Sequence, residues 1–142
     1  MPTSGKINPT KGEQGWKSTF SHGDEIAIPG YQRVYLEDYD IWTELTSTKR
    51  TTIYRFKFTK DVEANILTNL GGCLGNSTMI NADVRKISNT EFEGSFDSAG
   101  RFWGGPEKVK IFFCAKFDKP FESFNGWNEK EQLKNIKSLK GT

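Results

Sequence analysis

An alternation of side chains with a period of two recurs along this chain and limits what it can fold into. Such alternation is typical of β-strands, in which successive side chains point to opposite faces. It predicts three consecutive strands, at residues 30–37, 41–48 and 50–58. In the first of them, Tyr31, Arg33 and Tyr35 share one face. Pro29-Gly30 supplies a turn before this strand, and residues 38–40, which read D-Y-D, supply the hairpin connection after it.

Further strands are predicted at residues 65–70, 78–87, 90–97 and 107–117, with turn residues between them. The last segment has the most regular apolar face, formed by Val109, Ile111, Phe113, Ala115 and Phe117. About seven or eight short strands joined by turns are typical of an antiparallel β-sandwich. We therefore predict an all-β fold and a single β-sandwich domain over residues 1–142.

The C-terminus differs from the rest of the chain because its apolar residues have helical spacing. Asn128, followed three residues later by Glu131, has the pattern of a helix cap, and Gly141 is a stop signal. We expect a short helix or linker at residues 128–141. Three helical turns are marginally stable unless they pack against something.

Composition excludes several classes of protein. The chain is 35% hydrophobic and contains 11 Phe, 4 Trp and 4 Tyr, so it is not a disordered segment. A net charge of +2 does not favour nucleic-acid binding, and the lysines at 130, 134, 137 and 140 fit a solvated surface. No stretch is apolar enough for a membrane span or a signal peptide.

Few residues offer catalytic or metal-binding chemistry. His22 is the one histidine, which excludes a histidine-rich metal site, and no G-x-S-x-G nucleophile motif accompanies it. Cys73 and Cys114 could form a disulfide or remain two thiols. Glu91 and Glu93 would lie about 6.6 Å apart on one strand face, which is near the spacing of glycosidase carboxylates. Acidic residues alternating on a strand are also the ordinary solvent face of a sandwich.

One long segment contains an unusual series of short sequence motifs. Residues 20–50 contain F-S-H, an acidic residue, P-G-Y, a V-x-L strand, a D-Y step and E-L-T-x-T-x-R, in that order. The run resembles the N-terminal domain of glycoside hydrolase family 92, the calcium-dependent α-mannosidases. M-P-T-x-G at the start and F-x-x-P-F near the end resemble the family as well, so Met1 can be an internal residue. Gln32 and Thr51-Thr52 differ from the family's usual residues at these positions. These differences leave open which mannosidic linkage the enzyme cleaves.

The resemblance implies a piece of the N-terminal β-sandwich, of supersandwich or galactose-mutarotase-like architecture, in an exo-acting, α-1,2-mannosidase-like enzyme. In the family this domain packs on a helical (α/α) catalytic domain, which supplies the two carboxylates of an inverting mechanism and most of a calcium site. We therefore expect no catalytic residues, metal or cofactor in this chain, and calcium in the full-length enzyme. The implied partners are a mannose-containing glycan and the catalytic domain, and the parent protein is expected to be exported to the periplasm or secreted.

Five residues are candidates for the sugar pocket, because sugars are bound by planar polar groups and aromatic rings: His22, Glu25, Glu44, Arg50 and Trp103. Each also has an ordinary structural interpretation. His22 and Glu25 can fix the turn before Pro29, and Glu44 can form a cross-strand ion pair with Arg50, which contributes little at a surface. Trp103 can cover an edge of the sandwich or be buried against the catalytic domain.

Two other function classes fit the same sequence. An independent carbohydrate-binding module would expose coplanar aromatic rings and bind sugar without a partner. A structural interaction domain would expose an apolar patch and have no affinity for sugars.

Overall fold

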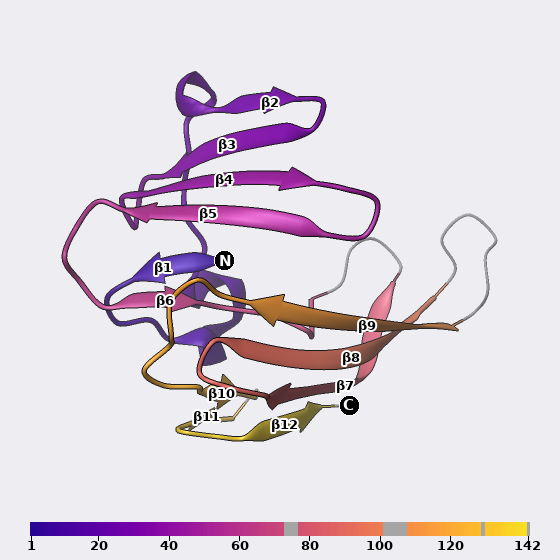
Figure 1. Ribbon diagram of the computed structural model, residues 1–142. Coiled ribbons are helices and arrows are strands. Elements are labelled where there is room, and N and C mark those ends of the chain that lie inside the picture. The colour runs from indigo at the N-terminus through magenta and orange to yellow at the C-terminus, as the bar shows by residue number, and fades with distance from the viewer. Residues whose placement is uncertain (73–76, 101–107, 129, 142) are drawn as a thin grey trace. The chain divides into compact units, whose positions relative to one another are not determined.

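The protein is described by a computed structural model that covers residues 1–72, 77–100, 108–128 and 130–141. Its backbone divides into two compact units, Met1–Thr68 and Asn69–Thr142. Each unit is built around a four-stranded antiparallel sheet (Figure 1). The prediction of a single domain over residues 1–142 stays a prediction.

The sheet of the first unit contains the three strands that the alternation predicts. It has the order β2-β3-β4-β5, formed by Ile26–Ile28, Tyr31–Leu36, Ile41–Ser47 and Thr52–Phe58. All neighbours are antiparallel and joined by short turns, as Figure 1 shows. Gly30, with φ of 81°, occupies a turn conformation that favours glycine.

A two-stranded pair, β1 (Pro2–Ser4) with β6 (Ala64–Ile66), completes the strands of the first unit. The predicted strand at residues 65–70 is therefore shorter and ends at Ile66. Two 3₁₀ helices, Pro9–Gly15 and His22–Asp24, precede the sheet. Ile41 has no exposed surface, and Leu36 and Leu67 are also buried, so the apolar core of this unit is small.

The sheet of the second unit has the order β12-β7-β8-β9, formed by Ser138–Gly141, Thr78–Lys86, Glu91–Ala99 and Lys108–Lys116. The predicted hairpin between β7 and β8 is confirmed, with its turn at residues 87–90. A bulge interrupts the pairing between Ile80 and Asp83, where Asn81 has a φ of 52°. A small hairpin, β10 (Gly126–Trp127) with β11 (Gln132–Leu133), follows β9 in the chain.

A phenylalanine cluster covers one face of this second sheet. Phe92 is buried, and its ring lies 5.5 to 6.2 Å from the rings of Phe113, Phe117 and Phe124. Gly94 makes the packing possible, because a Cβ atom there would lie 2.6 Å from Cζ of Phe113 and 2.3 Å from the Asp83 carbonyl oxygen. Only the carboxyl end of the predicted apolar face of β9 is covered, since Val109 and Ile111 remain exposed.

The predicted helix at residues 128–141 is wrong. Among the described residues of this segment, the chain forms β11 and β12 instead, and Leu139 pairs with Val84 of β7. The cap signal at Asn128 is real but local, because its side-chain oxygen accepts hydrogen bonds from the amides of Lys130 and Glu131 within the β10–β11 hairpin. Pairing along β7 outweighs a three-turn helix that is marginal alone.

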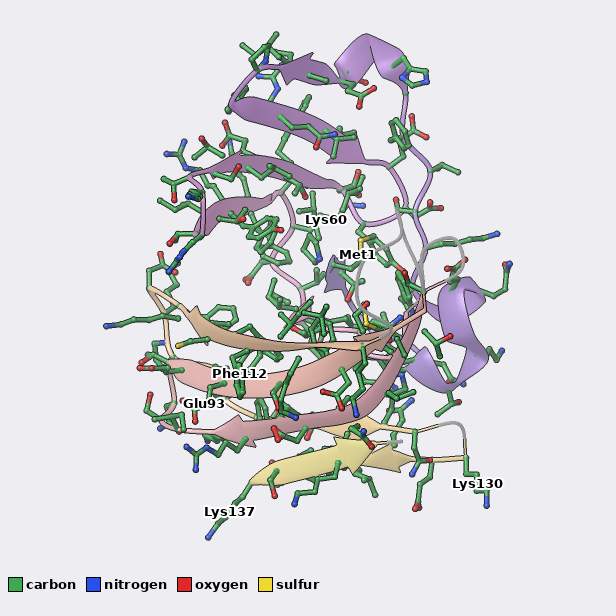
Figure 2. All side chains as sticks on the ribbon, turned by 90° about the vertical axis from the view of Figure 1, so that its right-hand side faces the viewer. Met1, Lys60, Glu93, Phe112, Lys130 and Lys137 are labelled. Atoms are coloured by element: carbon green, nitrogen blue, oxygen red, sulfur yellow. The ribbon has the colours of Figure 1, made fainter. Side chains whose placement is uncertain are left out.

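The lysines at 130, 134, 137 and 140 are exposed, as expected for a solvated surface. Lys130 and Lys137 point outward in Figure 2. Within the described residues, no helix is long and apolar enough to cross a membrane.

Candidate functional site

One face of the β2–β5 sheet combines aromatic and charged side chains. Strand register aligns Arg33, Glu44 and Arg55 in one row across β3, β4 and β5. The adjacent row contains Tyr35, Trp42 and Lys57. We call these six residues, together with Tyr31, the charged aromatic face.

Glu44 lies at the centre of a hydrogen-bond network on this face. The Tyr31 hydroxyl donates to its carboxylate at 2.7 Å, and Nη1 of Arg55 lies 3.3 Å from it. The Tyr31 hydrogen bond, helped by the charges of Arg55 and Arg33, lowers the pKa of Glu44 against the opposing effect of desolvation. The same bond raises the pKa of Tyr31. Glu44 is therefore held as a carboxylate in a fixed orientation.

The ion-pair partner of Glu44 is Arg55 and not Arg50. Arg55 lies directly across from Glu44 on the neighbouring strand. Arg50 lies in the turn between β4 and β5, where it is exposed. The predicted ion pair of Glu44 with Arg50 is therefore wrong, because the register places Arg55 and not Arg50 across from Glu44.

Asp40 forms a second network at the border of this face. It binds Lys60 and accepts a hydrogen bond from the Tyr35 hydroxyl at 2.7 Å. The Lys60 hydrogen bond, followed by that of Tyr35, lowers the pKa of Asp40. Asp40 and Glu44 thus both have partners from the chain itself.

Trp42 lies between these two networks. The guanidinium carbon of Arg33 is 4.7 Å from its ring centroid, in cation–π contact, and the Tyr35 ring lies 4.9 Å away. The Nε atom of Arg33 is buried and has no hydrogen-bond partner among the described residues. Stacking on tryptophan therefore fixes an arginine whose hydrogen-bonding capacity is not filled.

The candidates His22 and Glu25 form a separate pair beside strand β2. Nδ1 of His22 lies 2.7 Å from the Glu25 carboxylate, and Gln32 donates to the same carboxylate at 3.4 Å. Ser21 caps this turn by accepting from the Gly23 amide. The His22 side chain is 87% exposed, so it is available to a ligand.

Alternation along β3 separates this pair from Glu44. Glu25 bonds to Gln32, whereas Glu44 lies across from Arg33, and adjacent residues on a strand point to opposite faces. The structure brings His22 and Glu25 together and places Glu44 and Arg50 elsewhere. Trp103 lies outside the described residues.

Sequence reasoning missed Trp42, Arg33 and Lys57 as a group. The same alternation that placed Tyr31, Arg33 and Tyr35 on one face contained part of the signal. What it lacked was the register that sets Trp42 between Tyr35 and Lys57.

A shallow open groove of about 430 Å³ lies at the β2–β3 turn. It is lined by Ala27, Ile28, Pro29, Gly30, Tyr31, Gln32, Leu45 and Ser47. Tyr31 therefore belongs to both the groove and the charged aromatic face. The volume falls in the range of small-molecule sites, although the groove is open to solvent.

On the polar face of the second unit's sheet, the carboxylates have structural partners. Asp97 is 3% exposed and contacts Lys108, Lys110 and Asn81. These partners, Lys108 first, lower the pKa of Asp97 to about 2. The described residues contain no group of three or more histidine, cysteine or acidic side chains that could hold a metal ion.

Glu91 and Glu93 do not act as a pair. Glu93 accepts from Nε of Arg85 at 2.7 Å, whereas Glu91 lies 3.3 Å from the Cys114 sulfur. Cys114 carries a free thiol, and Cys73 lies outside the described residues.

Comparison with known proteins places this geometry in a family. The model of the glycosyl hydrolase family 92 N-terminal domain matches residues 1–142. The chain belongs to this family. Its resemblance at residues 20–50 is therefore confirmed over the whole sequence. No curated protein matches the chain.

Two solved structures share the fold of this family 92 domain, and both are of the GH92 α-mannosidase BT3965 from Bacteroides thetaiotaomicron. One is a complex with mannoimidazole, with a TM-score of 0.79, and the other has a TM-score of 0.80. Each is 23% identical in sequence, and each match covers 99% of this chain. The predicted antiparallel β-sandwich class is confirmed. The chain spans only 19% and 20% of those two chains.

Proposed function

We propose that this chain is a non-catalytic part of the N-terminal domain of an exo-acting, α-1,2-mannosidase-like enzyme. The observation that carries the proposal is the family match over residues 1–142, together with structural similarity to an α-mannosidase. Because the chain spans about a fifth of that relative, hydrolysis is assigned to the remainder of a longer polypeptide. Within that polypeptide, this domain packs on the catalytic (α/α) domain and forms one wall of a mannose pocket.

The exposed pair of His22 and Glu25 is the proposed sugar contact. A carboxylate fixed by a histidine and by Gln32 offers hydrogen-bond acceptors to sugar hydroxyls, and the imidazole offers a further polar atom. Phe20 lies beside His22, with 5.4 Å between ring centroids, and is itself exposed. An aromatic ring next to planar polar groups suits the mixed surface of a pyranose. Arg50 and Trp103 remain proposed contacts as well.

The proposed reaction is inverting hydrolysis of an α-mannoside in an exported enzyme. An inverting mechanism needs an acid and a base far enough apart to admit water between the base and the sugar. We assign both carboxylates, and the calcium ion expected in the full-length enzyme, to the catalytic domain. The domain described by this chain orients the sugar and shapes one wall of the mannose pocket.

The test compares the full-length polypeptide with the 142-residue chain on a chromogenic α-mannoside. Full-length protein should release mannose with inverted anomeric configuration, and the 142-residue chain should release none. Glu25→Gln in the full-length protein should raise KM several-fold, because a charged acceptor for sugar hydroxyls is lost. Glu122→Gln, an exposed residue of the second unit, is the matched control. Absence of mannosidase activity in the folded full-length protein would contradict the proposal.

A further inference from the structure

The charged aromatic face and its border carry four cations, Arg33, Arg55, Lys57 and Lys60. Asp40 and Glu44 are the carboxylates paired there, Asp40 with Lys60 and Glu44 with Arg55. The charges of Asp24 and Glu37 also act on Tyr35, so the surroundings of the face are balanced in charge. Two of the four cations nevertheless take part in neither of these two ion pairs.

The two remaining cations are Arg33 and Lys57. Among the described residues, neither has an ion-pair partner within 4.0 Å. Arg33 acts on Glu44 only at longer range, as one of the charges that lower the Glu44 pKa. An isolated lysine on a surface is ordinary, but a stacked arginine whose buried Nε has no hydrogen-bond partner among the described residues requires an explanation.

Both cations lie next to Trp42, so they could contact the same ligand. Lys57 is the direct cross-strand neighbour of Trp42, and Arg33 stacks on the same tryptophan at 4.7 Å. Stacking pre-organises the guanidinium, so less rotamer entropy is lost when it binds a ligand. Among the described residues, the buried Nε of Arg33 has no hydrogen-bond partner. A buried polar atom of this kind calls for an explanation, of which a bound water or ion is one.

The chemistry on this face suits a sugar that carries a negative charge. Tyr31, Tyr35 and Trp42 offer aromatic surface and hydroxyl groups, and Glu44 is a fixed acceptor for sugar hydroxyls. A neutral sugar would leave Arg33 and Lys57 without partners. A phosphate, sulfate or carboxylate substituent would accept charge-assisted hydrogen bonds from both.

We propose that the charged aromatic face binds an anionic sugar, with the ring against Trp42 and the anionic group between Arg33 and Lys57. The inference deepens the proposed function by naming the class of glycan this domain selects, and it rests on that function for the assignment to mannose. The proposed pair of His22 and Glu25 lies on the other side of β3 and is not part of this site.

The test measures binding by calorimetry at low salt with the full-length polypeptide. Four probes are compared: mannose, mannose 6-phosphate, mannuronic acid and inorganic phosphate. Mannose 6-phosphate or mannuronic acid should bind about tenfold more tightly than mannose, and their order separates phosphate from carboxylate recognition. Lys57→Met should remove most of this preference. Lys49→Met, an exposed lysine in the β4–β5 turn, is the matched control.

Each outcome decides between the two proposals, because mannosidase activity is measured on the same preparation. An active enzyme that binds mannose and its anionic derivatives equally would overturn the anionic site and leave the proposed function intact. An inactive protein that still prefers anionic sugars would support the anionic site and contradict the proposed function. Inorganic phosphate binding as tightly as the sugar phosphate, no binding of any probe, or an unchanged preference in Lys57→Met would each overturn the site.

Discussion

The two four-stranded sheets use their aromatic side chains in different ways. In the second unit, phenylalanine rings gather around Phe92, and Glu93 and Asp97 have arginine and lysine partners on the opposite face. In the first unit, Trp42 and two tyrosines share one face with arginine, lysine and glutamate. The first pattern is that of a core with a solvated face, and the second is the surface to which we assign ligand binding in our proposal.

The same contrast appears in how charges are satisfied. Asp97 has two lysines and an asparagine within contact, so its charge is fully compensated. Arg33 stacks on a tryptophan ring, and its buried Nε has no hydrogen-bond partner within the part of the chain that the structure describes. The compensated groups of the second unit stabilise its fold, whereas the proposed binding site contains the groups that are not compensated.

The largest test of this contrast compares Phe92→Ala with Trp42→Ala. Phe92 is 7% exposed, so its truncation should lower the free energy of unfolding by about 4 kcal/mol. Trp42 is only half-buried, and its truncation should cost about 2 kcal/mol or less. Urea denaturation measures both, with Phe92→Leu as a volume-conserving control. Equal losses would mean that Trp42 belongs to a core and would break the comparison.

Gly94→Ala should have the next largest effect. The added methyl group would approach the Asp83 carbonyl oxygen at 2.3 Å and the Phe113 ring at 2.6 Å, so strand and ring must both shift. We expect a loss of about 3 kcal/mol in urea denaturation. Gly141→Ala is the control in the same sheet, because a Cβ there meets nothing within 4 Å. Similar losses for the two variants would show that Phe113 does not pack over Gly94.

Asp97 should give a smaller, pH-dependent effect. Its partners lower its pKa from 3.8 to about 2 in the folded protein. A lowered folded pKa stabilises the protein above the unfolded pKa, and this contribution disappears as the pH falls from about 4 to about 2. Asp97→Asn should therefore be less stable at pH 7 and lose less stability on acidification. Asp118→Asn, in an exposed bend, should keep the wild-type pH profile.

Period-two alternation predicted most of the fold because it reports directly which face a side chain occupies. It placed β3, β4, β5 and the β7–β8 hairpin within a few residues of their observed bounds. It could not identify β1, whose three residues Pro2–Ser4 become a strand only by pairing with β6. Helical spacing of apolar residues gave the wrong structure at Leu139. The residue lies in a strand because it pairs with Val84.

The candidate site was predictable only in part. His22 and Glu25 are three residues apart, so their contact is local and could be inferred from the sequence. The partner of Glu44 depends on strand register, which sequence spacing did not determine, and it is Arg55. The stacking of Arg33 on Trp42 requires both register and side-chain orientation, so neither residue was a candidate.

Cys114 gives the smallest predicted effect and tests whether the polar face of the second sheet is as compensated as we argue. The hydrogen bond to Glu91, with burial and the charges of Glu91 and Glu93, raises the pKa of the Cys114 thiol. Less thiolate is then present near pH 8, so alkylation by iodoacetamide should be slow. In a Cys73→Ser background, Glu91→Gln should accelerate alkylation several-fold, because the thiol pKa falls toward its usual value, while Glu122→Gln leaves the rate unchanged. An unaltered rate in Glu91→Gln would mean that Glu91 does not engage the thiol, and that this face, like the charged aromatic face, holds a charge without a partner.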